Sequence, residues 1–374
     1  MAVSEATDIR AAGLHAVAAR FQFRGEVVAF LPYGNGHIND TYLVTCNGTC
    51  APVRYILQHI NRHVFHSPAV VMQNIERVTT HLAAQVAHEP DHARRALTLV
   101  PTRDGGNWYV DADGETWRAY PFIENARSYE MATSVEQAFQ AAEAFGRFQQ
   151  QLSSLPLPRL HETIPDFHHT PKRFAALQRA IAADVKGRVK LAQPEIDFAL
   201  AHESMAGVLI KASLHTDLPE RITHNDTKFN NLLLDDATGE SLCVVDLDTV
   251  MPGLVLYDFG DMVRTTTSPA AEDEQDLSKV TMQFPLFEAL VRGYLSAAGG
   301  FLTETEKKFL AFSGKLITFE VGIRFLADYL AGDTYFKIHR EGHNLDRCRT
   351  QFKLVESIEV QEEKMNRLVE SVAG

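Results

Sequence analysis

A short polar segment near position 226 has the residue types and the order that phosphoryl transfer requires. Residues 224–231 read HNDTKFNN, and Asp246 lies 15 residues beyond Asn231, at the end of the apolar run LCVV. Transfer to a hydroxyl needs a carboxylate that orients and deprotonates the acceptor, and oxygen ligands for the magnesium ion that neutralises the nucleotide's phosphates. Asp226 fits the base, and Lys228 can reach the γ-phosphate. Asn231 and Asp246 fit the ligands of Mg²⁺.

The alternative interpretation is a polar loop in which Asp and Asn merely cap turns. The preceding His224, the lysine two residues after Asp226 and the strand-borne Asp246 together favour the catalytic interpretation. Because a hydroxyl is a poor nucleophile at neutral pH, positioning and charge neutralisation should supply most of the rate.

Two further segments have the character of nucleotide-binding elements. Gly34, Asn35 and Gly36 lie between two predicted strands, where small residues let backbone amides approach phosphate oxygens. A lone Gly-x-Gly is a weak signal that often marks an ordinary hairpin turn, but its place in the first hairpin of a five-stranded lobe favours phosphate binding. Farther along, Phe122 and Ile123 lie in a hinge-like segment whose backbone can hydrogen-bond an adenine. A plain interdomain linker is compatible with that role.

Hydrophobic periodicity indicates which elements position these segments. Short alternating runs separated by turn residues predict strands, and apolar residues at helical spacing predict helices. The predicted strands of the first third are 26–33, 40–46, 53–60, 97–100 and 108–120, with a helix over 67–86 and turns at 104–106 and 113–114. The predicted helices beyond it are 134–155, 171–184, 194–206, 284–298, 303–331 and 345–372, while 221–261 has short β-type runs. We therefore expect a two-lobed α+β fold, with a small lobe over 1–120, a hinge over 121–125 and a mainly helical lobe over 126–374.

Composition excludes several classes of protein. The chain has 374 residues, of which 45% are hydrophobic, and a formal charge of −12, so it is neither disordered nor collagen-like. An acidic chain without a run of Lys or Arg is repelled by nucleic acid and by anionic membranes. No stretch of about 18 apolar residues predicts a membrane span, and the N-terminal residues lack the apolar core of a signal peptide.

Cysteine and histidine usage gives no metal or disulfide framework. The four cysteines are few and scattered, which favours a reduced, cytosolic setting, and the pair Cys46 and Cys50 lacks the second pair that a zinc site needs. The segment 156–170, with three prolines and three histidines, is typical of an irregular connector with scattered surface histidines rather than of a metal site.

Together these segments resemble the aminoglycoside phosphotransferase-like kinase family, small-molecule kinases with a protein-kinase-like fold. Within it, the strings are similar to those of the N-acetylhexosamine 1-kinases. These strings are PYGNGHIN at 32–39, YILQ at 55–58, THNDTKFNN at 223–231, VDLDT at 245–249, MPG at 251–253, DLSKV at 276–280 and RFLADYL at 324–330. The resemblance implies ATP and Mg²⁺ as cofactors and transfer of the γ-phosphate to the anomeric hydroxyl of N-acetylglucosamine or N-acetylgalactosamine.

The third strand departs from the protein-kinase pattern. Protein kinases have a Lys there that pairs with the α- and β-phosphates, and this chain has Gln58, which can donate a hydrogen bond but has no charge. The 1-kinases resemble this chain at that position, so we expect Lys228 and Mg²⁺ to supply the compensating charge. Glu76, on the following helix, would be the usual partner of the absent Lys, and a solvated helix charge is an equal alternative.

A second departure concerns the tripeptide Asp258-Phe259-Gly260, which spells the metal motif of protein kinases. It lies 27 residues beyond Asn231, whereas Asp246 directly follows the strand after the catalytic segment. The resemblance therefore assigns the metal to Asp246 and leaves Asp258 to bind the backbone of the catalytic loop. Asp248 would project to the same side as Asp246 if the strand continued, as a second ligand or as a turn cap.

The sugar site is implied by the resemblance. A neutral polyol needs several placed donors and acceptors, and an N-acetyl group needs a small apolar wall. The family match gives hexosamine contacts to His37 and Asn39 from the glycine loop, to Asp226, and to Arg324 and Tyr335. Arg324 has an alternative role in helix pairing with the residues four before and four after it. Gly332 and Asp333 should end this helix and leave Tyr335 in a loop.

Two competing functions fit parts of the sequence. The first keeps the fold and changes the acceptor to choline, homoserine or an aminoglycoside; for a cationic acceptor the acidic run 271–276 could be offered as the pocket. A solvated loop is the better interpretation of that run, and Arg324 disfavours a cation. The second is a non-catalytic pseudokinase, motivated by Gln58 and opposed by the intact set of Asp226, Asn231 and Asp246.

Overall fold

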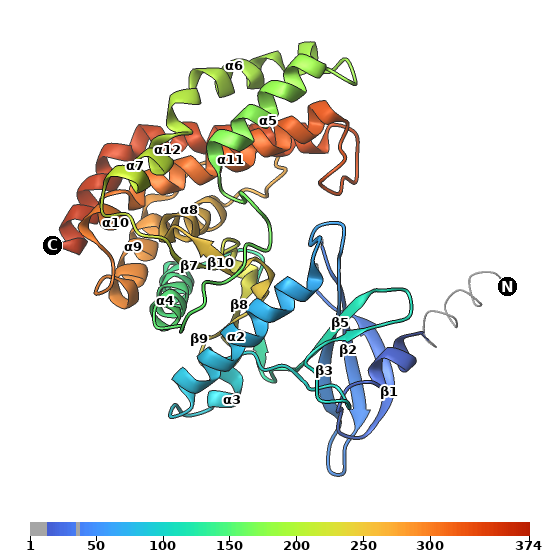
Figure 1. Ribbon diagram of the computed structural model, residues 1–374. Coiled ribbons are helices and arrows are strands. Elements are labelled where there is room, and N and C mark those ends of the chain that lie inside the picture. The colour runs from blue at the N-terminus through green and yellow to red at the C-terminus, as the bar shows by residue number, and fades with distance from the viewer. Residues whose placement is uncertain (1–12, 35–37) are drawn as a thin grey trace. The chain divides into compact units, whose positions relative to one another are not determined.

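The computed structural model describes residues 13–34 and 38–374. They form two compact units: the first contains the described residues up to Ala126 together with Leu155–Ile164, and the second contains Arg127–Ser154 and Pro165–Gly374. The first unit is a sheet with helices, and the second is mainly helical (Figure 1). This architecture confirms the predicted α+β fold class.

A five-stranded antiparallel sheet organises the first unit, with strand order β1-β2-β3-β5-β4. Its strands are β1 (Glu26–Pro32), β2 (Asp40–Asn47), β3 (Val53–Ile60), β4 (Tyr109–Val110) and β5 (Thr116–Pro121). Alternation places Val44, Leu57 and Ala119 on one face, in a core with Phe21 and Phe23. The residues between them, among them Gln58, face the opposite side of the sheet.

Helix α2 (Pro68–Val86) follows β3, close to its predicted bounds, and α3 (His92–Arg95) is a single turn. A proline in the first turn and a buried stripe of Val71, Ile75, Val78 and Leu82 account for α2. The predicted strand at 97–100 is wrong: that segment is irregular, and only the amide of Val100 joins the sheet, by a bond to Ala119.

The connector 155–164 belongs to the first unit because α2 holds its backbone. The side-chain amide of Asn74 donates to the carbonyl of His161 at 2.8 Å and accepts from its amide at 3.0 Å. Arg77 donates to the carbonyls of Pro156 and Pro158, at 2.6 Å each. Paired carbonyls and a buried Asn therefore hold a segment that has no regular structure of its own.

Helices make up most of the second unit. They are α4 (Val135–Leu152), α5 (Thr170–Ala183), α6 (Gln193–Ala201), α7 (Val208–His215), α8 (Val255–Thr266), α9 (Phe284–Ala298), α10 (Glu304–Lys308), α11 (Leu310–Ala331) and α12 (His343–Ala373). Ser134 caps α4 by accepting from the amide of Gln137. The predictions for α4, α5, α9 and α12 are confirmed to within three residues.

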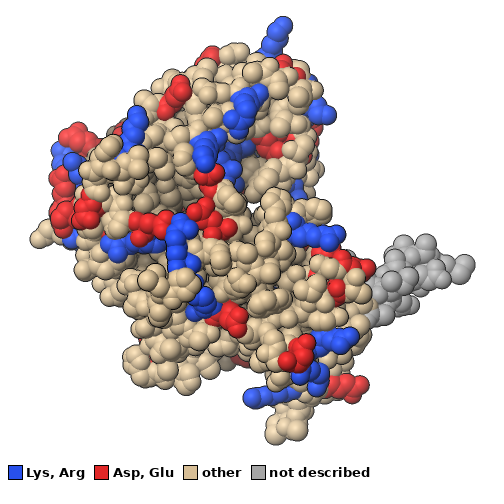
Figure 2. All heavy atoms as spheres, viewed as in Figure 1, with Lys and Arg blue, Asp and Glu red and all other residues tan. Residues whose placement is uncertain are grey.

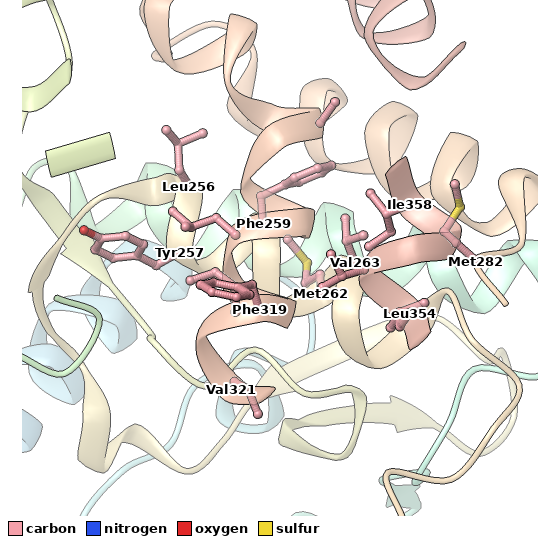
Figure 3. Packing of buried hydrophobic residues seen from close by; sticks show 14 of the residues in the cluster. Leu256, Tyr257, Phe259, Met262, Val263, Met282, Phe319, Val321, Leu354 and Ile358 are labelled. Carbon is pink, nitrogen blue, oxygen red and sulfur yellow. The ribbon is translucent and has the colours of Figure 1, made fainter. Parts of the chain in front are cut away.

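The core of this unit lies where α8 packs against α11 and α12. Figure 3 shows Phe259, Met262 and Val263 of α8 beside Phe319 of α11 and Ile358 of α12. These side chains are buried. Helix α8 is therefore an internal support, and residues at its start are held firmly.

Helix α8 occupies the end of a region whose sequence predicts β-type runs only, so that prediction is wrong there. Its polar residues Asp258, Asp261 and Arg264 recur every third position, as in an amphipathic helix, but the fold buries them too. The predicted helix 303–331 breaks into α10 and α11 at Phe309, and the predicted helix 194–206 ends at Ala201. Helix α7 was not predicted.

Two small sheets in the second unit flank the polar segment around Asp226. Strand β7 (Arg221–Thr223) pairs with β10 (Met251–Gly253), and β8 (Leu232–Asp235) pairs with β9 (Ser241–Val244). The two-residue β6 (Ala126–Arg127) completes the order β6-β8-β9. The segment 224–231 thus connects one sheet to the other.

Charged side chains of both signs are interspersed on the face shown in Figure 2. Such mixing on an acidic chain does not attract polyanions. Among the residues that the structure describes, no helix combines the length and apolarity that crossing a bilayer requires.

Candidate active site

Asn225, the residue before Asp226, has a left-handed backbone with φ of 65°. Its side chain fixes this conformation: the amide group donates to the carbonyls of Thr223 and Thr249, at 3.2 and 2.9 Å, and the oxygen accepts from the Thr223 hydroxyl at 3.0 Å. Asn tolerates positive φ better than most residues. Strand β7 and the segment just before β10 therefore contribute to the turn that presents Asp226.

The carboxylate of Asp258 holds the other side of this turn. It accepts the amides of His224 and Asn225, at 2.9 and 2.6 Å, and the side chain of Gln149 at 2.6 Å. Burial raises the pKa of Asp258, although His224 and these donors oppose the shift. The expectation that Asp258 binds the catalytic-loop backbone is confirmed.

His224 links the turn to the strand that leads to Asp246. Its Nε2 lies 2.9 Å from the carbonyl of Val245, and its Nδ1 lies 3.3 Å from the amide of Asp226. Since a carbonyl only accepts, Nε2 has the proton and Nδ1 accepts. The rings of Phe145 and Phe148 contact its edges. Both ring nitrogens of this buried histidine bind backbone groups, so its role is to hold the loop in place.

Asp226, Lys228 and Asn231 come together as predicted from their spacing. The ammonium of Lys228 lies 2.9 Å from Asp226 Oδ1, and Asn231 Nδ2 lies 3.2 Å from Oδ2. Burial would raise the pKa of Asp226, but Lys228 and His224 hold it below its ordinary value. The Asp226 carboxylate in turn raises the pKa of Lys228. At neutral pH the site therefore contains an ionised carboxylate, suited to accept a proton, beside a fixed cation.

A backbone hydrogen bond connects the segments that contain Asn231 and Asp246. The amide of Val245 donates to the carbonyl of Asn231 at 2.9 Å, which places Asp246 beside it. Asn231 uses its nitrogen to bind Asp226, so its side-chain oxygen is turned to other partners. Mg²⁺ takes one or two protein oxygens and completes its shell with water and phosphate. Asn231 and Asp246 therefore remain the predicted metal ligands.

The premise for Asp248 as a second ligand is wrong. Strand β9 ends at Val244, Asp246 has a left-handed backbone with φ of 59°, and a 3₁₀ helix covers Leu247–Thr249. The strand therefore does not continue, and Asp248 is buried at 2% exposure while Asp246 is exposed.

Arg324 lies on α11 between two aromatic rings. Its guanidinium carbon is 5.1 Å from the ring centre of Phe167 and 5.6 Å from that of Phe336. The alternative ion pairs along the helix are not formed: Glu320 binds His168 and Thr170, and Asp328 binds backbone amides. Within the described part of the chain, no hydrogen bond or ion pair engages this half-buried guanidinium. Its donors are therefore available to a ligand.

Tyr335 lies in a loop that Asp328 holds, as predicted. Helix α11 ends at Ala331, Gly332 has a left-handed backbone, and the Asp328 carboxylate accepts the amides of Thr334, Tyr335 and Phe336. The Tyr335 ring is 54% exposed and contacts the Phe336 ring at 4.8 Å between centroids. One carboxylate thus sets the loop that supplies both aromatic residues beside Arg324.

Several predicted nucleotide residues lie in the first unit. Asn35, Gly36 and His37 fall outside the described residues. Gly34 has a φ of 76°, and its neighbour Tyr33 contacts the Phe122 ring edge-on at 5.7 Å. The end of β1 that leads into Gly34 and the hinge therefore meet at one end of the sheet.

The hinge backbone offers one amide to a ligand. Phe122 uses its own amide to bind the carbonyl of Arg54, whereas the amide of Ile123 has no acceptor among the described residues. Ile123 is buried at 9% exposure, where an amide normally needs a partner. Asn39, by contrast, uses its side-chain oxygen to accept the amide of Asn61 at 3.0 Å.

Gln58 lies directly opposite Arg118 on the neighbouring strand. Nε of Arg118 donates to Gln58 Oε1 at 3.0 Å, and Gln58 Nε2 donates to the Thr41 hydroxyl at 3.0 Å. Arg118 is only 1% exposed and lies over the Tyr120 ring. Glu76 is half-buried and accepts from Asn107, so it is neither a solvated charge nor an ion-pair partner of this arginine.

Sequence reasoning missed three residues of this machinery. His168, assigned to the scattered surface histidines, is buried and contacts Asn225 and Glu320. Arg118 was not singled out, although an arginine in a run of apolar strand residues, TWRAY, was a visible signal. For Glu320 the signal was an acidic residue within the apolar string of α11.

Comparisons with known proteins agree with this geometry. A model of the phosphotransferase enzyme family matches residues 29–297, which is more than half of the chain. The chain belongs to this family of phosphotransferases, whose small-molecule kinases share a protein-kinase-like fold.

Solved structures show the same fold at low identity. An aminoglycoside phosphotransferase from Alicyclobacillus acidocaldarius is 11% identical, with a TM-score of 0.62 over 95% of this chain and 96% of that chain. A spectinomycin phosphotransferase in complex with ADP and spectinomycin is 12% identical, with a TM-score of 0.52 over 90% and 93%. An ethanolamine kinase from Plasmodium vivax is 14% identical, with a TM-score of 0.53 over 86% and 82%.

Proposed function

We propose that this phosphotransferase is an ATP-dependent N-acetylhexosamine 1-kinase, which phosphorylates the anomeric hydroxyl of N-acetylglucosamine or N-acetylgalactosamine. The observation that carries the proposal is Arg324, held between Phe167 and Phe336 in the unit that contains Asp226. A guanidinium donates to sugar hydroxyl and acetamide oxygens, and flanking rings suit the apolar face of a sugar and its methyl group.

Arg324 also disfavours the cationic acceptors of related kinases. Like charges placed together in a site cost binding free energy. The acidic run 271–276, which would suit a cation, is already engaged: Glu272 binds Arg264 at 3.0 Å, and Asp273 binds His343 at 3.0 Å. The sequence-based interpretation of this run as a solvated loop is therefore incomplete, because part of it is anchored by ion pairs.

Three features of the first unit support nucleotide binding there. The Gly34 turn suits phosphates, and the Ile123 amide suits an adenine ring nitrogen. Arg118 provides a buried positive charge beside Gln58, where protein kinases have a lysine. The spectinomycin phosphotransferase in complex with ADP supports a nucleotide as the phosphoryl donor. Sequence reasoning gave the compensating charge to Lys228 and Mg²⁺, and Arg118 adds a third source.

In the proposed reaction the Asp226 carboxylate accepts the proton of the C1 hydroxyl as its oxygen attacks the γ-phosphorus. The new O–P bond forms as the bond from the γ-phosphorus to the bridging oxygen breaks, and ADP leaves with the electron pair. Lys228, held 2.9 Å from Asp226, places a cation beside the transferring group. Mg²⁺ on Asn231 and Asp246 would supply further charge neutralisation to the phosphates.

A coupled ADP-release assay with Mg·ATP tests the acceptor class. The panel is N-acetylglucosamine, N-acetylgalactosamine, glucose, galactose, choline, homoserine and kanamycin. We expect turnover on the N-acetyl sugars, with ³¹P NMR showing phosphate at the anomeric position. Turnover only on choline, homoserine or kanamycin would keep the catalytic residues and overturn the sugar site. No turnover on any acceptor would favour a pseudokinase.

A further inference from the structure

His168 connects the catalytic turn to helix α11. It lies two residues before α5, and its side chain is 4% exposed. Its Nδ1 is 2.8 Å from Glu320 Oε1, and its Nε2 is 3.1 Å from the carbonyl oxygen of Asn225. The other oxygen of Glu320 accepts from the hydroxyl of Thr170. Every polar atom of this buried pair therefore has a partner.

The partners determine where the protons lie. The Asn225 carbonyl only accepts, so Nε2 must have a proton. Glu320 is completely buried, and burial would raise its pKa, but His168, Arg324 and Thr170 hold that pKa below its ordinary value. Hydrogen bonds to an ionised carboxylate are stronger than neutral ones, so the contacts with His168 and Thr170 hold Glu320 in place.

The same loop contacts the candidate acceptor site. Phe167, the residue before His168, stacks on Arg324, and its carbonyl accepts from Arg173 at 3.1 and 2.9 Å. Arg324 lies four residues after Glu320, which is about one helical turn and the same face of α11. Two consecutive loop residues thus contact two consecutive turns of one helix, and one of them also binds the catalytic turn.

We propose that His168, held by Glu320, is a positioning residue for phosphoryl transfer. The bond from its Nε2 fixes the Asn225 carbonyl, and thereby the carboxylate of Asp226, while the bond to Glu320 orients the ring. This inference rests on the proposed function for the roles of Asp226 and Arg324. Its physical basis is the steep dependence of rate on geometry, since a misplacement of about 1 Å can cost about 100-fold in rate.

Two substitutions at position 168 separate the two bonds. An Asn side chain places its amide near the position of Nδ1, so H168N keeps a donor to Glu320 and loses the bond to Asn225. A Gln side chain reaches the position of Nε2, so H168Q keeps the donor to Asn225 and loses the bond to Glu320. T170V is the matched control, because it removes one bond to Glu320 and leaves the Asn225 carbonyl untouched.

We expect H168N to lower kcat by about 10- to 100-fold, with the KM for ATP changed less than about threefold. H168Q and T170V should each lower kcat by less than about threefold. Circular dichroism and the thermal midpoint establish that each variant is folded. Equal losses of kcat in H168N and H168Q would overturn the proposal, because the bond to Asn225 would then have no effect of its own.

If H168N or H168Q does not fold, the same two substitutions can be compared in a second background. In the background of E320Q neither H168N nor H168Q leaves an unpaired buried charge, and the same ordering of kcat is expected; its absence would overturn the proposal. The assay uses whichever acceptor the wild-type protein phosphorylates. Turnover on an acceptor other than an N-acetyl sugar would sink the proposed function, while the comparison of H168N with H168Q would still decide the role of His168.

Discussion

The carboxylate of Asp258 accepts the backbone amide of Asn225 at 2.6 Å, so a residue at the start of a buried helix fixes the turn that presents Asp226. The hydroxyl of Thr227, the residue after Asp226, donates to the carbonyl of Asp258 at 2.6 Å. One residue of α8 therefore contacts the chain on both sides of the candidate base. Hydrogen bonds from two backbone amides and from Gln149 compensate for the burial of its carboxylate.

Asp258 should be needed for catalysis although its carboxylate binds only the backbone of the turn and Gln149. In Asp258→Asn one carboxylate oxygen becomes an NH₂ group, which cannot accept the amide of Asn225 or of His224. A buried amide without an acceptor costs about 1–3 kcal/mol, so the turn should shift. We expect kcat to fall about tenfold or more, with little change in the KM for ATP. Steady-state kinetics measure this, with the exposed Asp113→Asn as the control; an unchanged kcat would contradict the role.

The pH dependence of kcat should reflect the lowered pKa of Asp226. Burial acts to raise this pKa, and Lys228 reverses the effect. An ionised base is retained until the pH falls through the lowered value, so kcat should stay level below the ordinary carboxyl pKa of about 3.9 wherever the protein remains folded. In Lys228→Met burial is no longer opposed by the ammonium, and the acid limb of kcat should move to higher pH.

The lowered pKa of Asp226 should also make the stability of the protein depend on pH. A carboxyl group whose folded-state pKa is depressed stabilises the protein above its unfolded-state pKa, and this contribution is lost as the pH falls through the folded value. The stability difference between the wild type and Asp226→Asn should therefore shrink on acidification. Thermal midpoints at pH 7 and at pH values below the unfolded-state pKa of about 3.9 test this. For the acid limb of kcat, Lys353→Met, at an exposed ion pair, is the control for Lys228→Met. An acid limb that does not move in Lys228→Met would remove Lys228 as the cause.

The elements that could be predicted from sequence are those whose signal is local. Strands β2 and β3 alternate, and α4 has apolar residues at helical spacing, so periodicity was sufficient. Helix α8 was not predicted although its polar residues Asp258, Asp261 and Arg264 recur every third position, because the fold buries them against partners such as Gln149 that are distant in sequence. His168 and Arg118 were missed for a related reason: their partners, Glu320 and Gln58, are distant in sequence, and only the fold brings them together.

The tripeptide Asp258-Phe259-Gly260 has a structural explanation in this fold. Phe259 is completely buried between helices, and Gly260 lies where α8 approaches α11. A Cβ at Gly260 would lie 2.5 Å from the carbonyl oxygen of Ser313 and 2.7 Å from Ile317. Backbone cannot yield to such a contact as a flexible side chain can. The glycine therefore permits the helix spacing that places Asp258.

Gly260→Ala should destabilise the second unit through this contact. Overpacking of a well-packed interior costs about 1–3 kcal/mol. We expect a lower midpoint in thermal denaturation followed by circular dichroism. Gly300→Ala is the matched control, because a Cβ there meets no atom within 4 Å. Equal midpoints for the two variants would show that the helices can separate at no cost.

Arg324 should determine affinity for the acceptor rather than for the nucleotide. Its planar group stacks on Phe167 and Phe336, and Lys offers neither the plane nor the fork of donors. We expect Arg324→Lys and Arg324→Met to lower kcat/KM for the acceptor by about tenfold or more, with the KM for ATP unchanged. Arg292→Lys, at an exposed helix pair with Glu288, is the control. A rise confined to the KM for ATP would place Arg324 outside the acceptor site.

Arg118 should bind the nucleotide's phosphates in place of the strand lysine of protein kinases. Arg118 is buried and charged, and it lies directly across from Gln58 on the neighbouring strand. Its positive charge is therefore close to the position that the lysine occupies in protein kinases. Arg118→Met should weaken ADP binding by about tenfold or more while leaving adenosine binding unchanged, because only ADP has phosphates. Isothermal titration measures both ligands and separates phosphate recognition from a loss of folded protein.

The double variant Gln58→Lys with Arg118→Met gives the sharper test of this charge. It restores a cation at the lysine position of protein kinases and removes the arginine, so ADP affinity should recover toward the wild-type value. Gln58→Met with Arg118→Met, which has neither charge, is the matched control and should not recover. If Arg118→Met weakens adenosine and ADP equally, Arg118 supports the sheet and does not contact phosphate, and the compensating charge must then come from Lys228 and the metal site.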